Sequence, residues 1–162
     1  MLFQGIGQQV EIESKVFEVV KRYLQVSLCL PESGGAIFGR ESPDGSLLVI
    51  NHITEPMDGD KQSRRHFDRL DTGHGKRFTQ LNTEANIYAY VGDWHTHPQA
   101  IPKPSTQDRR NWTDLLEMDV TRKVQYHLIA GTREARVWSS GPSIGDIRML
   151  LILRWEELSS ND

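Results

Sequence analysis

The sequence is nearly free of cysteine, because Cys29 is the single one among its 162 residues. One thiol excludes an internal disulfide and suits a reducing cytoplasm. It also excludes a zinc-dependent nucleobase deaminase, because such enzymes combine a His-x-Glu motif with the two cysteines of Pro-Cys-x-x-Cys. Cys29 lies late in an apolar-periodic segment, so we expect a buried structural thiol and not a nucleophile.

Long apolar runs and an excess of basic charge are also absent. No run approaches the roughly 20 apolar residues that span a bilayer, and the first residues lack the basic start and apolar core of a secretory signal. The formal net charge of −3 and the isoelectric point near 6.1 argue against a dedicated nucleic-acid-binding protein, which is usually basic. We therefore expect a cytoplasmic protein whose partners include neither a membrane nor nucleic acid.

Repeats and low-complexity linkers are lacking too, so the 162 residues predict a single domain over residues 1–162. Apolar residues from Ile12 to Leu24 recur at helical spacing and predict an amphipathic helix that ends near Leu30. No element is predicted for residues 2–5, which resemble a viral 3C-type protease cleavage sequence. The remaining patterns predict strands at 36–39, 47–53, 87–94, 125–130 and 135–139, and helices at about 78–85, 105–118 and 147–158. This order predicts an α/β fold with a single mixed β-sheet flanked by helices.

Two histidines, His95 and His97, stand two residues apart at the end of the strand-like run 87–94. Side chains two apart on a strand point to the same side, so both imidazoles can face one ion. Pro98 cannot donate to a sheet ladder and should end the strand just past them. Alone, a His-x-His pair is more often two surface histidines than a metal site.

A carboxylate follows where a helix is predicted to begin. Asp108 would lie in the first turn of that helix, aimed back at the end of the histidine strand. Ser105-x-x-Asp108 also matches an N-terminal capping box, and the Ser105 hydroxyl can serve both the cap and a site because it donates and accepts. With the two histidines, the carboxylate predicts a metal site that keeps an open coordination position. Glu32, far upstream in Pro31-Glu32-Ser33-Gly34-Gly35, could complete a hydrolytic site.

These residues together resemble the JAMM signature of JAB/MPN-domain metallopeptidases. The signature has a glutamate, then His-x-His, ten residues and an aspartate, with a serine three before the aspartate; the matching residues are Glu32, His95, His97, Asp108 and Ser105. Residues 32–39 and 92–98 are similar to the family's glutamate-containing strand and its second motif, with Thr96 where serine is common. The resemblance runs from about residue 10 to residue 139. It implies the JAB/MPN fold, with its cytidine-deaminase-like core, and one metallopeptidase domain over residues 1–162.

The resemblance also implies a role for each residue. His95, His97 and Asp108 would bind one zinc ion (Zn2+) per chain, with a water in the fourth position. Glu32 would be the general base that activates this water and later protonates the leaving amine. Ser105 would donate a hydrogen bond to the oxyanion. Zinc lowers the pKa of its bound water from ~15.7 toward ~7, which makes hydroxide available at neutral pH.

The segment 54–76 has the least regular pattern of the chain. Two interpretations stay open: a solvated, partly mobile loop, or a substrate-guiding insert beside the active site, as inserts near the zinc are in relatives. Its positive charges are Lys61, Arg64, Arg65, Arg69 and Lys76. Four histidines outside the signature have no matching spacing and are expected to be structural or exposed; these are His52, His66, His74 and His127.

The resemblance implies a zinc-dependent isopeptidase. Its partner would be a protein with an extended C-terminal tail, and the bond cut would lie at the C-terminus of a ubiquitin-like or CD-NTase-type conjugate. Among the family members, the sequence looks most like the deconjugating enzymes of CBASS anti-phage systems, which release a cGAS-like nucleotidyltransferase from its C-terminal conjugates.

Two alternatives remain at this point. One is a non-catalytic MPN-type scaffold that keeps zinc only as a staple. Structural zinc sites usually have four protein ligands, whereas three are evident here, and this favours catalysis. The other is a JAB peptidase that processes a sulfur-carrier protein or another C-terminal precursor.

Overall fold

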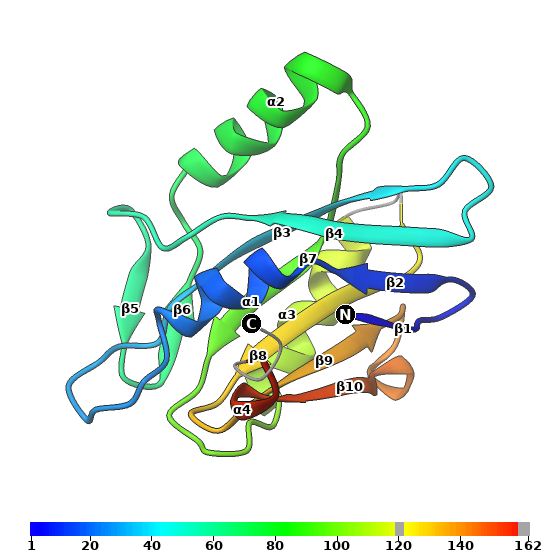
Figure 1. Cartoon of the computed structure of the whole chain (residues 1–162). Helices are drawn as coiled ribbons and strands as arrows, with labels where there is room; N and C mark the ends of the chain where they lie inside the picture. Colours follow the sequence, from blue (N-terminus) through cyan, green and yellow to red (C-terminus); the bar gives the residue numbers. More distant parts are fainter. Residues whose placement is uncertain (119–121, 159–162) are drawn as a thin grey trace.

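A mixed eight-stranded sheet forms the centre of the computed structural model, which describes residues 1–118 and 122–158. The strand order is β1-β2-β4-β3-β7-β8-β9-β10 (Figure 1). Neighbouring strands are antiparallel, except that β2 runs parallel to β4 and β7 runs parallel to β8. The strand bounds are β1 (Leu2–Gln4), β2 (Gln9–Ile12), β3 (Gly34–Glu41), β4 (Leu47–Ile53), β7 (Ala89–Thr96), β8 (Gln125–Ala130), β9 (Glu134–Ser140) and β10 (Arg148–Arg154). The α/β prediction with a mixed sheet is confirmed.

Helices cover both faces of this sheet. Helix α1 (Ser14–Lys21) lies on the near face in Figure 1, and α3 (Thr106–Met118) lies on the far face. The two faces follow from strand alternation: along β8, Leu128 joins the large core cluster that includes α1, whereas Ile129 packs with Trp112 of α3. The other helical elements are α2 (Gly73–Ala85), α4 (Trp155–Leu158) and the short 3-10 turn η1 (Ile144–Asp146). No helix among the described residues is long and apolar enough to cross a bilayer.

The central elements agree with the sequence prediction. Strands β3 and β4 pair antiparallel across the turn at 42–46, and the histidine strand, α3 and the β8–β9 pair occur close to their expected bounds. Helix α2 ends where it was expected but begins earlier, at Gly73 instead of about residue 78. These elements combine a clear apolar period with turn residues at their ends. The sheet therefore brings the Glu32 segment and the His95 strand together, because β3 pairs directly with β7.

The predicted first helix is partly wrong. Ile12 belongs to strand β2, and α1 ends at Lys21 instead of running to about Leu30. Val10 and Ile12 alternate with polar neighbours and face the core from β2, so the pattern changes period just before the helix. Residues 2–5 contribute strand β1, which pairs with β2. Cys29 lies beyond α1 and is exposed, so the expectation of a buried thiol is also wrong.

The predicted closing helix at 147–158 is wrong as well. Most of it is strand β10, which pairs antiparallel with β9 through a register shift, and only α4 is helical. The five apolar residues 149–153 fit a buried helix and a strand equally well, and periodicity alone does not separate the two. These residues form a strand because they pair with β9, and Leu153 is buried in this arrangement.

The irregular segment 54–76 contains a small second sheet. Strands β5 (Lys61–Ser63) and β6 (His66–Asp68) form an antiparallel hairpin whose tip is Arg64-Arg65. Of the two interpretations left open for this segment, the irregular loop does not hold for β5 and β6, although β5 is solvent-exposed. In Figure 1 the β5–β6 hairpin lies at the opposite side of the molecule from the β3–β4 turn.

Candidate metal centre and active-site cavity

Strand β7 presents the two histidines to the face covered by α3. His95 lies in β7 and His97 follows its last residue, Thr96. The backbone N–H of His97 donates to the carbonyl of Ala130 at 2.9 Å, which extends the parallel pairing with β8. Trp94 points to the other face and belongs to the α1 side of the core. The sheet thus fixes the direction of both imidazoles.

Three ligand atoms converge at this point. The Nε2 atoms of His95 and His97 are 3.0 Å apart, and the Asp108 carboxylate lies 3.2 Å from the first and 3.5 Å from the second. Ligands about 2.1 Å from a tetrahedral zinc are about 3.4 Å from one another. The two imidazoles and the carboxylate therefore fit such an ion in both chemistry and spacing, and they form a group that could hold a metal.

Asp108 is placed by the start of α3. Its carboxylate accepts the Ser105 backbone N–H at 2.6 Å, and its own N–H donates to the Ser105 hydroxyl at 3.1 Å. The capping-box interpretation is therefore correct, and it holds together with the ligand interpretation. Burial alone would raise the Asp108 pKa, but hydrogen bonds from His95 and His97 hold it well below the usual range of an aspartate. The carboxylate is ionised, as a metal ligand must be.

Glu32 lies just before β3 and is only 6% exposed. Its backbone N–H donates to the Ser63 carbonyl of the β5–β6 hairpin at 2.8 Å. Burial raises the pKa of its carboxyl group, and the nearby imidazoles of His97 and His95 offset part of that rise. Glu32 is not among the three residues of the ligand group.

A cavity of about 800 Å³ contains all of these groups. One wall is the hairpin segment 64–70, and another is the first half of α3. The five residues that were predicted from the sequence to share a site all line this cavity: Glu32, His95, His97, Ser105 and Asp108.

The remaining histidines are packed or exposed, as expected. His52 is partly buried against Tyr88, and His66 is exposed beside Asp68 at the cavity edge. His74 is buried against Asp60, and His127 is fully buried. None of the four belongs to the ligand group.

Among the lining residues that were not foreseen, two contact the buried His127. Asp93 lines the cavity and accepts a hydrogen bond from His127 at 2.8 Å. Trp112 of α3 stacks on the His127 ring with 4.3 Å between ring centroids. The signal was present in the spacing, because Asp93 is two residues before His95 on the same strand face, and Trp112 is one helical turn after Asp108.

Comparison with known proteins agrees with this geometry. An Escherichia coli (strain TW11681) protein named CD-NTase/cGAS isopeptidase is 32% identical over 151 residues, which cover 93% of this chain and 92% of the relative. A Vibrio cholerae serotype O1 protein of the same name is 37% identical over 91 residues, or 56% of this chain and 57% of the relative.

The fold also occurs in a solved structure. Protein DSY2949 of Desulfitobacterium hafniense superposes with a TM-score of 0.58 at 17% identity, over 86% of this chain and 88% of that one. Residues 23–141 match the family model described as prokaryotic homologs of the JAB domain. Since this match covers most of the sequence, the chain belongs to the family of prokaryotic JAB-domain homologs.

Proposed function

We propose that this chain is a zinc-dependent isopeptidase that hydrolyses the bond at the C-terminus of a CD-NTase-type protein conjugate, as a single JAB domain over residues 1–162. The convergence of His95, His97 and Asp108 in a cavity that also holds Glu32 carries the proposal. The relatives named CD-NTase/cGAS isopeptidase support the substrate class, and the E. coli one aligns over 92% of its length.

The donor set supports a catalytic zinc ion. His95, His97 and Asp108 supply three ligands, the number typical of catalytic zinc sites, whereas structural sites usually have four. When bound, zinc supplies Lewis acidity that lowers the pKa of a coordinated water and polarises a carbonyl. The residues of the chain then have to move protons and orient the substrate around that position.

Glu32 is suited to move the proton. A general base works best when its pKa lies near the operating pH, and burial shifts the Glu32 pKa in that direction. Its carboxylate takes a proton from the attacking water while the hydroxide adds to the carbonyl carbon. The same proton then passes to the leaving nitrogen as the C–N bond breaks. The products are a carboxylate and a free amine.

Ser105 is suited to stabilise the oxyanion. Its hydroxyl oxygen already accepts the Asp108 N–H, so the hydroxyl proton stays available for donation. Donors of this kind act most strongly when they are fixed before the reaction, and the capping box fixes Ser105 at the start of α3.

The walls of the cavity suit an extended protein tail. The β5–β6 hairpin and α3 both contribute polar side chains to the lining of the cavity that contains the ligand group. The segment 54–76 is therefore a substrate-guiding insert in this proposal, with Arg64, Arg65 and Arg69 among the lining residues.

The test uses a CD-NTase-type nucleotidyltransferase with a C-terminal protein fusion. The zinc-loaded wild type and Glu32→Ala are compared, and the products are identified by intact mass. We expect the wild type alone to cut directly after the nucleotidyltransferase C-terminus, with equal zinc content in both proteins. Equal cleavage by Glu32→Ala would contradict the proposed base, and absence of cleavage by the zinc-loaded wild type would contradict the substrate class.

A further inference from the structure

The β5–β6 hairpin forms a wall of the cavity although each of its strands has only three residues. A hairpin of this size is marginal in water without further support. Its base is closed by the carboxylate of Asp60, which is fully buried. This carboxylate accepts the backbone N–H groups of Leu70 and Asp71 at 2.9 Å each and that of Met57 at 2.8 Å. It therefore joins the chain before β5 to the chain after β6.

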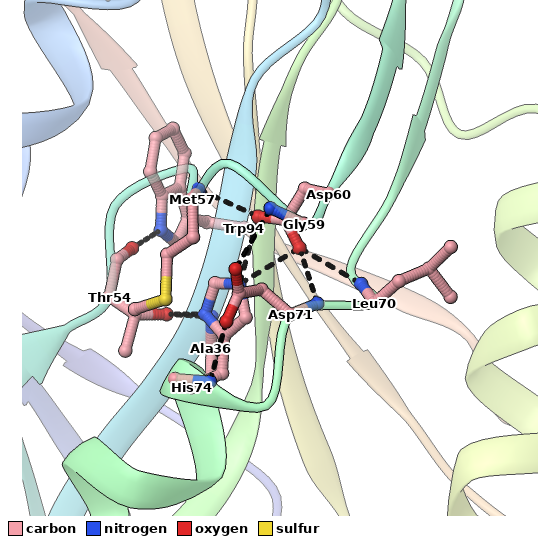
Figure 2. Close-up of polar contacts among 10 residues, drawn as sticks. Ala36, Thr54, Met57, Gly59, Asp60, Leu70, Asp71, His74 and Trp94 are labelled. Atoms are coloured by element: carbon pink, nitrogen blue, oxygen red, sulfur yellow. Dashed lines mark hydrogen bonds and ion pairs between the residues drawn. The ribbon is translucent and has the colours of Figure 1, made fainter.

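His74 connects this carboxylate to the main sheet (Figure 2). Its Nε2 lies 2.9 Å from Asp60, and its Nδ1 lies 2.5 Å from the Thr54 hydroxyl. That hydroxyl accepts the Ala36 N–H of β3 at 2.8 Å. The Thr54 hydroxyl can then donate its own proton to Nδ1 of His74. The ring proton of His74 is in that case on Nε2, which donates to the Asp60 carboxylate. One neutral tautomer of His74 thus satisfies every group in the chain of contacts.

Thr54 is in turn attached to the strand of the metal ligands. Its carbonyl accepts the Trp94 indole N–H at 2.8 Å, and Trp94 directly precedes His95. Figure 2 shows Thr54 between the Trp94 indole and the His74 ring. Gly35 leaves room for this approach, because a Cβ there would lie under 3.0 Å from the Thr54 carbonyl. An unbroken set of contacts therefore runs from the His95 strand to the base of the hairpin.

The hairpin is held separately at its tip. The Ser63 carbonyl accepts the Glu32 N–H at 2.8 Å, and the Arg64 carbonyl accepts the Gln25 side-chain amide at 2.9 Å. Glu32 does not depend on these contacts alone, because the neighbouring Ser33 pairs with Thr96 of β7 through hydrogen bonds of 2.8 and 3.0 Å. Loosening the base of the hairpin should therefore move the cavity wall more than it moves Glu32.

We propose that Asp60 and His74 are positioning residues for the substrate, which hold the β5–β6 hairpin so that the cavity is already shaped for an extended protein tail. This inference rests on the proposed function. A wall that is fixed in advance removes an ordering cost from binding. If only a tenth of the molecules keep the hairpin in place, the apparent dissociation constant rises about tenfold. The effect falls on KM, because neither side chain is among the metal ligands or the cavity lining.

The first test is Asp60→Asn, which keeps the shape but replaces a carboxylate oxygen by an amide donor that faces N–H groups. With the zinc-loaded protein and the nucleotidyltransferase fusion, we expect KM to rise about tenfold and kcat and zinc content to stay near wild type. His74→Gln keeps an N–H for Asp60 and should lie between the wild type and His74→Phe. Equal KM values for these two His74 variants would overturn the role of the hydrogen bond.

A second readout needs no substrate. Trypsin should cut the native Asp60→Asn protein after Arg69 faster than it cuts the wild type, because the Leu70 N–H of that peptide bond loses its hydrogen bond to the Asp60 carboxylate. Mass spectrometry identifies the cut. An unchanged rate, or an unchanged KM, would overturn the proposal. A wild type that leaves the fusion intact would instead contradict the proposed function, while the trypsin rate still decides whether Asp60 holds the hairpin.

Asp44→Asn is the matched control. Asp44 likewise closes a tight turn, where it accepts hydrogen bonds from the Ser42 hydroxyl at 2.6 Å and from the Ser46 hydroxyl at 2.7 Å. That turn joins β3 to β4 and lies away from the β5–β6 hairpin in Figure 1. We expect wild-type KM and a wild-type trypsin rate at the hairpin. If Asp44→Asn raises KM as much as Asp60→Asn, the effect is general destabilisation and the proposal fails.

Discussion

The ring of His127 in β8 lies 2.8 Å from the carboxylate of Asp93 in β7, the strand that carries the candidate metal ligand His95. The ring is fully buried, and its other nitrogen lies 2.8 Å from the Ser140 hydroxyl. An Asp-His-Ser order of this kind resembles a hydrolytic triad, but the burial of its serine denies a substrate access. The arrangement instead supports the strand, because it leaves each polar group of the buried imidazole with a partner.

The first prediction concerns this pair. His127→Leu should lower the free energy of unfolding by about 2–3 kcal/mol, because the buried Ser140 and the partly buried Asp93 lose their hydrogen bonds. Urea unfolding measures the change. His66→Leu is the control, since His66 forms an ion pair of the same 2.8 Å with Asp68 at the surface; its effect should stay within about 0.5 kcal/mol. Similar losses in both variants would show that burial of the pair is unimportant.

The second prediction distinguishes the proposed metal ligand His95 from the proposed base Glu32. His95→Ala should lose the zinc ion, because only two protein ligands remain, whereas Glu32→Gln should keep a full equivalent. Metal analysis of the proteins after dialysis against zinc-free buffer measures the content. Zinc loss from Glu32→Gln would place Glu32 among the ligands, and zinc retention by His95→Ala would remove His95 from them.

The third prediction concerns pH. Glu32 must be ionised to act as a base, and burial raises its pKa. Activity should therefore fall as the pH drops through this raised pKa, at a higher pH than for a glutamate in water, whose pKa is about 4.3. The pH profile of kcat/KM checks this. An acid limb at or below the value for an exposed glutamate would contradict the assignment.

The raised pKa of Glu32 also affects stability, and its effect has the opposite dependence on pH. A carboxyl group with a raised pKa binds its proton more tightly in the folded state, so stability falls as the pH rises from its ordinary pKa through the raised value. Metal-free Glu32→Gln should therefore have a higher Tm than metal-free wild type at neutral pH, and the difference should shrink near pH ~4. Thermal unfolding with a chelator measures it.

The fourth prediction uses two glycines with opposite expectations. Gly35→Ala should destabilise by about 2 kcal/mol or more, because its Cβ would press on the Thr54 backbone. Gly75→Ala should stabilise by up to about 1 kcal/mol, because Gly75 lies in α2 with nothing near the new methyl group. Chemical denaturation of both variants measures these changes, and a common sign would refute the packing argument.

The sequence allowed the site to be predicted better than the edges of the fold. His95, His97 and Asp108 carry their spacing within two adjacent elements, so strand and helix geometry brings them together. The distant Glu32 came from resemblance to a family, since no local rule predicts that β3 pairs with β7.

Elements that depend on tertiary contacts were missed. Strands β1, β2 and β10 exist because neighbouring strands pair with them, and their short or uniformly apolar patterns do not specify a strand. The contacts at the base of the β5–β6 hairpin converge on the Asp60 carboxylate, which accepts backbone N–H groups from a loop position and therefore leaves no periodic signal. His74 is structural, which was one of the two expected outcomes, but its partners Asp60 and Thr54 could be identified only in three dimensions.

The direct pairing of Gly34 with His95 determines when the centre can assemble. The two residues lie on either side of β4, the β5–β6 hairpin and α2 in the chain, so their contact closes a long loop. Contacts between distant residues form slowly during folding. As the polypeptide leaves the ribosome, the histidines emerge after Glu32 and Asp108 emerges later still, so the ligand group and the candidate base cannot come together before residue 108 has emerged.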